Sequence, residues 1–212
     1  MTVHMFGEGG LDIDGLLDRL ARKDAAVQEI THQSNLALKG AKRSMFALQR
    51  RGAVDEARAQ LEETRDVLGH MQLRFPANKV RRSCGPWRVA VEEFLEALYF
   101  FQFMNETPLD SDNDPLVHFQ LEDGSGQLHF EDAAIFGALS DLTGEIGRQI
   151  QMWIRDDQYD QAIAGNQAIA TIVEHLNRNT SGGHLRKKVD QANGNLGRSD
   201  GRITDLKVRG LI

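Results

Sequence analysis

The sequence predicts an all-α protein, and two observations carry that prediction. Apolar side chains recur at steps of three and four residues through most of the chain, the spacing that places them on one face of an α-helix. Proline is rare, with four in 212 residues, and runs rich in Val, Ile, Thr and aromatic side chains, which are typical of strands, are scarce. We therefore expect a bundle of several helices.

The helical pattern starts and stops at recognisable residues, which gives the order of the elements. The first long pattern covers residues 27–48, and Gly52 follows as its predicted C-terminal cap. An earlier apolar piece at residues 13–21 belongs to this helix or forms a short one of its own. The next pattern starts almost at once, so we expect the two helices to form an antiparallel hairpin. In order, the further helices are predicted at residues 54–71, 87–104, 131–155, 156–176 and 185–208.

Two segments fall outside these helices. Residues 1–10 are predicted to be flexible, and they lack the basic and apolar regions of a signal peptide. Residues 105–126 are polar and acidic, with prolines and an Asp-Gly pair, and are predicted to form a surface excursion around a short helical piece at residues 116–121. There is no internal repeat and no sign of a second domain, so residues 1–212 are predicted to form a single domain.

Charge and composition exclude several classes of protein. With 25 Lys and Arg against 31 Asp and Glu, the net charge of −6 argues against a protein coated in positive charge, although a local basic patch can still bind nucleic acid. The single cysteine, Cys84, excludes an internal disulfide framework and a Cys-rich zinc site. No apolar run approaches the roughly 20 residues that span a bilayer. We therefore predict a cytoplasmic protein that does not contact a membrane.

Four carboxylates occupy positions where the helical pattern calls for apolar side chains. Glu93 and Glu96 lie on a second apolar stripe of the third long helix. Asp141 and Glu145 lie on a similar stripe of the fourth. The plain alternative is that these acids line a solvated face, with Arg148 pairing to Glu145 three residues before it.

A buried carboxylate needs a partner, and this requirement gives the four acids a chemical meaning. An unpaired one costs several kcal/mol, which it avoids by taking a proton, pairing with a cation or binding a metal. If the two pairs of acids face each other, one or two Mg²⁺ ions would neutralise them, with Mn²⁺ as a substitute. Two such ions can activate a water molecule and stabilise the leaving oxygen in phosphodiester cleavage.

Four segments resemble the translin/TRAX family, in the same order along the chain. They are residues 41–50 (AKRSMFALQR), 92–97 (EEFLEA), 141–148 (DLTGEIGR) and 206–210 (LKVRG). The third is similar to the signature Asp-Leu-Thr-Gly-Glu-Leu-x-Arg of translin-associated factor X (TRAX), and the second is similar to Gln-Glu-Tyr/Phe-Val-Glu-Ala. The resemblance extends from about residue 22 to the end and favours the TRAX-like branch. One departure is Glu92, where the family has Gln.

The resemblance implies a fold, an assembly and an activity. Family members are all-α, with a bundle of about seven helices in an α–α superhelix, and they form hollow hexamers or octamers that enclose RNA. TRAX cleaves single-stranded RNA in a metal-dependent reaction, and its catalytic acids correspond to Glu93, Glu96 and Asp141, with Glu145 as a fourth member. The chain is shorter than animal TRAX, which implies a compact archaeal-type homologue that assembles with itself. A translin partner is expected only in a eukaryotic source.

Basic side chains cluster just before the third long helix, where the family has a nucleic-acid-binding segment. Their charges would neutralise phosphates of the substrate. Trp87, beside them, can stack on a base or pack in the core, and we favour the core. The residues expected to bind nucleic acid are Lys79, Arg81, Arg82, Arg88 and, in the fourth helix, Arg148.

The predicted function is Mg²⁺-dependent endonucleolytic cleavage of single-stranded RNA inside a hollow homo-oligomer, with single-stranded DNA as a second candidate substrate. The alternative is a non-catalytic, translin-like shell that binds single-stranded nucleic acid, in which the four acids are structural. A ferritin-like di-iron protein is a third class, but it requires two Glu-x-x-His elements. The chain offers one, Glu29 to His32, away from the core stripe of its helix.

Overall fold

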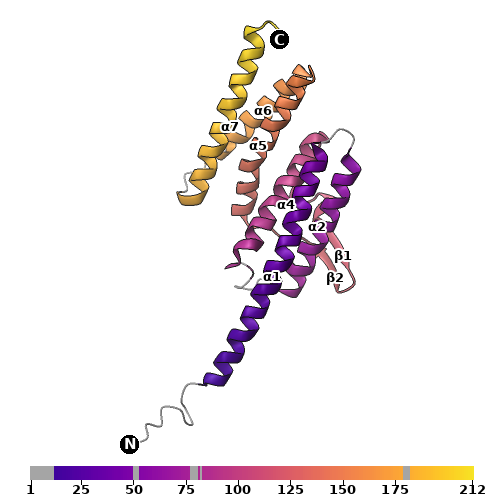
Figure 1. The fold of residues 1–212 in the computed structure, drawn as a ribbon, viewed down its shortest axis with the longest axis vertical. Coiled ribbons are helices and arrows are strands. Elements are labelled where there is room, and N and C mark those ends of the chain that lie inside the picture. Colours follow the sequence, from indigo (N-terminus) through magenta and orange to yellow (C-terminus); the bar gives the residue numbers. More distant parts are fainter. Residues whose placement is uncertain (1–11, 50–52, 77–80, 82, 179–181) are drawn as a thin grey trace, which may run out of the picture.

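Six α-helices make up most of the described chain (Figure 1). The structure is a computed structural model and describes residues 12–49, 53–76, 81, 83–178 and 182–212. The helices are α1 (Ile13–Leu48), α2 (Val54–Arg74), α4 (Gly85–Met104), α5 (Asp132–Arg155), α6 (Tyr159–Leu176) and α7 (Gly183–Val208). The all-α prediction is confirmed, and six helices within the described ranges are close to the number that the resemblance implies. None of these described helices is long and apolar enough to cross a membrane.

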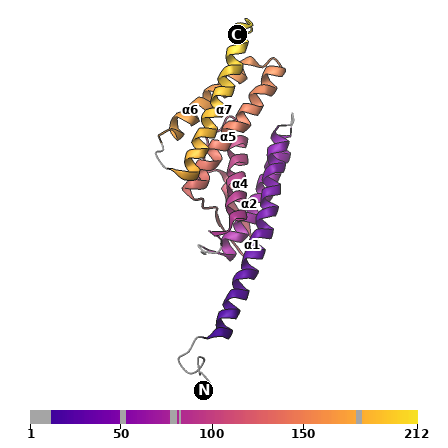
Figure 2. The same ribbon diagram turned by 60° about the vertical axis from the view of Figure 1, so that its left-hand side comes forward.

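Helix α1 is one element of 36 residues, so the apolar piece at residues 13–21 belongs to it. The Asp12 side chain caps its start by accepting a 2.9 Å hydrogen bond from the Gly15 N–H. Its fully buried stripe begins only at Ile30, and the first turns extend beyond the other helices (Figure 2). The exposed apolar side chains of this extension are Ile13, Leu16, Leu17 and Leu20. The predicted cap at Gly52 lies outside the described residues.

Helices α4 and α5 are at the centre of the packing. On one side, α1, α2 and α4 contact one another, and on the other side α5, α6 and α7 do the same. The two groups meet mainly where α4 packs against α5, as Figures 1 and 2 both show. Phe94 and Leu98 of α4 and Leu142 and Ile146 of α5 are completely buried. Polar side chains on the facing sides of these two helices therefore lie against the main core.

One helix begins later than the sequence predicts, and another is continuous where its sequence pattern weakens. Helix α6 begins at Tyr159 and not at residue 156, because Asp157 has a φ of 57°, which lies outside the right-handed helical region. Helix α7 is continuous to Val208, although the sequence pattern weakens at its glycines. Burial of one face of α7 against α5 and α6 therefore outweighs the low helix propensity of glycine.

The predicted helical piece at residues 116–121 is wrong. The chain forms a 3₁₀ turn, η1 (Pro115–Val117), and then an antiparallel hairpin of β1 (His118–Leu121) and β2 (Gly124–Gln127). Burial alternates along β1, and its buried Phe119 packs over Gly69 of α2. This period of two, followed by Asp-Gly, is typical of a hairpin rather than a helix. The excursion is therefore held against α2 through Phe119.

The contact between Phe119 and Gly69 gives a testable prediction about stability. A Cβ atom on Gly69 would lie 2.6 Å from Cγ of the Phe119 ring, so the ring or the helix would have to shift. We expect Gly69→Ala to lower the free energy of unfolding by about 1–3 kcal/mol in urea denaturation. The control is Gly147→Ala in α5, where a Cβ atom meets nothing within 4 Å. There we expect a gain of about 0.5–1 kcal/mol, and an equal loss in both variants would contradict the assignment.

Candidate active site

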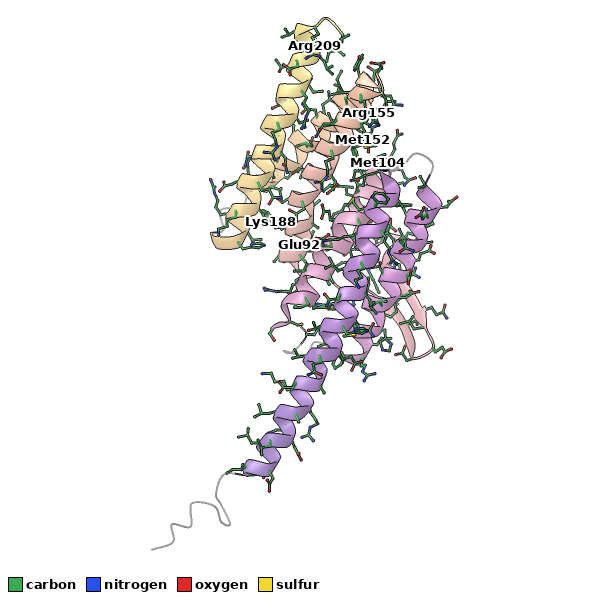
Figure 3. All side chains as sticks on the ribbon, in the orientation of Figure 1. Glu92, Met104, Met152, Arg155, Lys188 and Arg209 are labelled. Carbon is green, nitrogen blue, oxygen red and sulfur yellow. The ribbon has the colours of Figure 1, made fainter. Side chains whose placement is uncertain are left out.

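A groove of about 630 Å³ opens where α4, α5 and the start of α7 come together. Its charged lining residues are Arg88, Glu92 and Glu93 of α4, Glu131 before α5, Asp141 of α5, and His184 and Lys188 of α7. Figure 3 shows Glu92 and Lys188 close together between α4 and α7. Two of the four predicted acids, Glu93 and Asp141, therefore line one groove.

Glu96 lies deeper than the other acids of α4, with 8% of its surface exposed. It makes no hydrogen bond or ion pair with any other described residue. The pKa of Glu96 is raised to about 8, first because burial disfavours the charged form and then because Asp141 and Glu93 repel it. The positive charges of Arg148 and Lys188 offset only part of this effect. Glu96 is therefore a buried acid that needs a nearby cation in order to ionise at neutral pH.

Glu93 shares the same electrostatic environment. Burial is the main reason that its pKa is raised, and the charges of Asp141 and Glu92 raise it further. Lys42 of α1 opposes this shift, with its ammonium 3.8 Å from Oε1 of Glu93. The negative charge of Asp141 on α5 thus raises the pKa of both Glu93 and Glu96 on α4.

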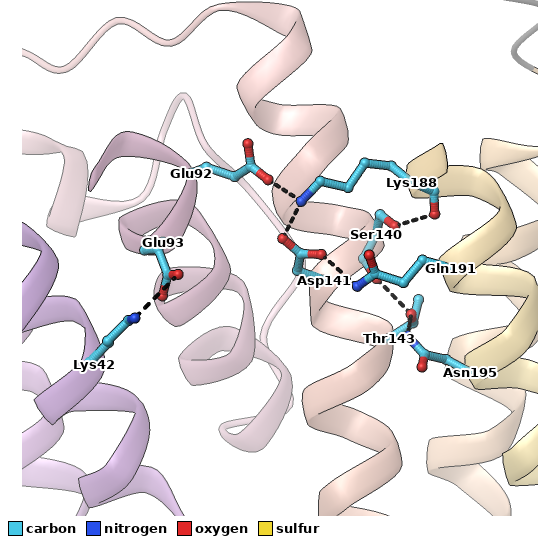
Figure 4. Close-up of polar contacts among 9 residues, drawn as sticks. All are labelled: Lys42, Glu92, Glu93, Ser140, Asp141, Thr143, Lys188, Gln191 and Asn195. Carbon is cyan, nitrogen blue, oxygen red and sulfur yellow. Dashed lines mark hydrogen bonds and ion pairs between the residues drawn. The ribbon is translucent and has the colours of Figure 1, made fainter. Parts of the chain in front are cut away.

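Asp141 is bound from α7. Its Oδ2 atom pairs with the Lys188 ammonium, and its Oδ1 atom accepts a 2.9 Å hydrogen bond from the Gln191 side chain (Figure 4). Lys188 also pairs with Glu92, so one ammonium bridges α4 and α5. Burial alone would lower the pKa of Lys188, but its hydrogen bonds to Asp141 and Glu92 outweigh burial and raise it. Lys188 therefore stays charged and neutralises this part of the groove.

Glu145 has partners of a different kind. It is 5% exposed, and its Oε2 atom accepts hydrogen bonds from Arg148 at 2.8 Å and from Gln49 of α1 at 2.9 Å. Arg148 also pairs with its other oxygen. The charges of Asp141 and Glu93 thus act on Glu96, whereas Glu145 is paired with Arg148. For Glu145 the expected pairing with Arg148 is observed, but the side chain is buried and does not lie on a solvated face.

The three grouped acids suit a hard divalent cation in their chemistry. Carboxylate oxygens are the donors that Mg²⁺ and Mn²⁺ prefer, and Glu96 forms no ion pair with any described residue. Across the described ranges, however, no three His, Cys, Asp or Glu side chains converge closely enough to hold a metal ion. Glu93 instead pairs with Lys42, and Glu92 and Asp141 share the single ammonium of Lys188. Metal binding would therefore require these side chains to rearrange.

The basic residues lie beside the groove only in part. A second pocket, of about 120 Å³, adjoins it and is lined by Arg81, Trp87 and Arg88 among others, and Arg88 lines both. The guanidinium carbon of Arg81 lies over the Trp87 ring, 5.0 Å from the ring centroid. Trp87 is 7% exposed, which confirms the expected core position. Arg148 points to Glu145, and Lys79 and Arg82 lie outside the described residues.

Sequence reasoning missed the cations that contact the acids. Lys188 is in register with Ala192, Asn195 and Ser199, the buried positions of α7 at steps of four and three. This register is the signal that could have identified it, because a lysine on a buried stripe requires an anionic partner. Lys42 carries no such signal, since it is exposed on α1.

The fold and site define a helical bundle with an acidic cluster at its central helix pair. The profile of the translin family matches residues 19–210, nearly the whole chain. The chain therefore belongs to the translin family. The expectation of this family from the sequence motifs is confirmed.

Solved structures with a similar fold agree with this assignment. The crystal structure of AfC3PO has a TM-score of 0.76 and 20% identity, covering 95% of this chain and 100% of that one. AfC3PO in complex with duplex RNA has a TM-score of 0.74 at 20% identity, covering 94% and 98%. Apo-NeC3PO has a TM-score of 0.72 at 16% identity, covering 91% and 96%. At these identities the likeness concerns the fold. The sequence has no significant match among curated proteins.

Proposed function

We propose that the protein is a Mg²⁺-dependent endoribonuclease of the TRAX-like branch that cleaves single-stranded RNA, with single-stranded DNA as a second substrate. The observation that carries the proposal is the buried carboxyl of Glu96, which lacks a polar partner among the described residues and is repelled by Glu93 and Asp141. A carboxyl at this depth has to keep a proton, pair with a cation or bind a metal, because an unpaired buried charge costs several kcal/mol. A divalent cation is the partner that would serve all three carboxylates.

In this proposal Glu93, Glu96 and Asp141 hold Mg²⁺, or Mn²⁺ in its place. When bound, such an ion supplies positive charge that stabilises a leaving oxygen and lowers the pKa of a coordinated water. The chain itself presents the three carboxylates from α4 and α5 and keeps Glu96 away from bulk solvent. Exclusion of water strengthens each charge–charge interaction at the site. Glu145 has a separate role in this proposal, since it accepts a hydrogen bond from Arg148 and holds that side chain in place.

Nucleic acid is the substrate class that the surroundings of the groove support. Arg88 lies in the groove itself, and Arg81 lies in the adjoining pocket, where each can neutralise a phosphate. In the same proposal Lys79 and Arg82 extend this basic segment, and Arg148 contacts the strand beyond Glu145. A structure with a similar fold, AfC3PO, is described in complex with duplex RNA.

We further propose that the protein assembles with itself into a hexamer or octamer. The extension of α1 carries the exposed apolar stripe of Ile13, Leu16, Leu17 and Leu20. A stripe of this kind is normally covered by another protein surface. A second copy of the chain is the partner that the family assignment favours.

A non-catalytic shell that binds single-stranded nucleic acid is the second candidate function. It is favoured by the ion pairs of Lys188 with Glu92 and Asp141, which neutralise part of the groove without a metal. The two functions differ in what happens to bound RNA. The shell retains RNA intact in the presence of Mg²⁺, whereas the nuclease cuts it.

One assay separates these functions. Purified protein is incubated with single- and double-stranded RNA and DNA in the presence of Mg²⁺, Mn²⁺, Ca²⁺ or EDTA. The nuclease proposal expects cleavage of single-stranded RNA with Mg²⁺ and Mn²⁺ and none with EDTA. RNA that is bound in a mobility shift and stays intact with both ions would establish the shell instead.

A further inference from the structure

Lys188 of α7 lies between two carboxylates of the groove. Its ammonium forms ion pairs with Glu92 of α4 and Asp141 of α5, and 12% of its side chain is exposed (Figure 4). One lysine thus neutralises acids from two helices beside the proposed metal site. A positive charge in this position competes with a divalent cation, because like charges repel strongly where solvent is largely excluded.

Both oxygens of Asp141 are occupied by donors from α7. One pairs with Lys188, and the other accepts from Gln191, which is three residues further along the helix. A metal ion that approaches this carboxylate has to compete with both donors for its oxygens. Withdrawal of Lys188 also removes a positive charge, so it helps a cation more than withdrawal of Gln191 does.

The backbone of α7 is held against α5, so any exchange has to occur within the lysine side chain. The Ser140 hydroxyl donates a 2.6 Å hydrogen bond to the carbonyl oxygen of Lys188. Further along, the Asn195 amide donates a 2.7 Å hydrogen bond to the Thr143 hydroxyl. The flexible four-carbon stem of a lysine allows its ammonium to move while these anchors stay in place.

Glu92 provides an anionic partner that Lys188 can keep when it leaves Asp141. The Glu92 carboxyl lies against Gly137 of α5, where a Cβ atom would be 2.6 Å from its Cδ. The glycine therefore makes room for this side chain.

We propose that Lys188 is an exchangeable counter-ion of the acidic site. In the metal-free protein it neutralises Asp141, and when a divalent cation binds Asp141 the ammonium turns to Glu92 alone. Lys188 and Glu92 are then positioning residues that set the affinity for the ion. This inference rests on the proposed function, because the ion is the one assigned there to Glu93, Glu96 and Asp141.

Binding of Mn²⁺ to the full chain, measured by electron paramagnetic resonance, tests the inference independently of cleavage. We expect Lys188→Met to bind Mn²⁺ about tenfold more tightly than wild type, since a competing charge is removed. Glu92→Gln should bind more weakly, because Lys188 then has Asp141 as its anionic partner. In the double variant the Glu92 effect should vanish, since it acts through Lys188. Lys187→Met, at an exposed neighbouring position, is the matched control and should bind as wild type does.

Each other outcome is decisive. Unchanged or weaker binding in Lys188→Met overturns the exchange, and weaker binding from Glu92→Gln in the Lys188→Met background makes Glu92 a ligand instead. If Lys188→Met does not fold, tighter or unchanged binding in Glu92→Gln overturns the inference on its own. The proposed function fails separately, and the exchange with it, if wild type binds no Mn²⁺ or if Glu96→Gln binds it as tightly as wild type.

Discussion

Replacing Glu96 with Gln is expected to reduce Mg²⁺-dependent cleavage of single-stranded RNA by about a thousandfold. The amide has nearly the same shape as the carboxyl, so the packing around this buried position is kept. It cannot carry the negative charge that a divalent cation requires, and the three-carboxylate set is reduced to two. The rate is measured under single-turnover conditions with saturating Mg²⁺, so that a loss in RNA binding is not mistaken for a loss in chemistry.

Companion variants show whether the loss belongs to the site. Asp141→Asn and Glu93→Gln should lose activity to a similar degree, while Glu122→Gln on the exposed hairpin should cleave as wild type does. RNA binding in a mobility shift should survive in all four variants. Cleavage retained by the Glu93, Glu96 and Asp141 variants alike would contradict the proposal that these acids are catalytic, and would favour a structural role for them.

The helices could be predicted from the sequence because each depends mainly on its own pattern of apolar residues. The stripe of α1 and the limits of α4 and α5 follow from that local rule. The hairpin was missed because a four-residue strand is too short to distinguish its period from that of one helical turn. The hairpin is held in place by the contact of Phe119 with Gly69, which lies 50 residues earlier in the sequence. No local pattern reveals such a contact.

For the site, too, local sequence patterns predict the burial of single residues but not the contacts between distant ones. The depth of Glu96 follows from its position on an apolar stripe of α4. The hydrogen bond from Gln49 to Glu145 and the ion pair of Lys188 with Asp141 join residues far apart in the chain. Such pairs depend on how helices cross, and periodicity specifies the faces of helices but not their partners.

The stability of the metal-free protein is expected to fall as the pH rises from about 5 to about 8 because of Glu96. In the folded state the pKa of this acid is about 8, whereas its ordinary value is 4.5. Between these values the folded chain holds a proton that the unfolded chain has released, so raising the pH favours unfolding. A shift of this size corresponds to a few kcal/mol, and the raised pKa of Glu93 acts in the same direction.

Urea denaturation in EDTA at several pH values between 5 and 8.5 measures this slope. Gln cannot titrate, so Glu96→Gln should remove most of the decline seen in wild type, while Glu122→Gln should follow wild type throughout. Mg²⁺ should act in the opposite sense, because it binds the ionised carboxylates and competes with the proton. The increase in the free energy of unfolding that Mg²⁺ gives to wild type should therefore be larger at pH 8.5 than at pH 6. Equal pH slopes in wild type and Glu96→Gln would show that this acid is ionised and paired in the folded protein. That result would remove the observation on which the proposed metal site rests.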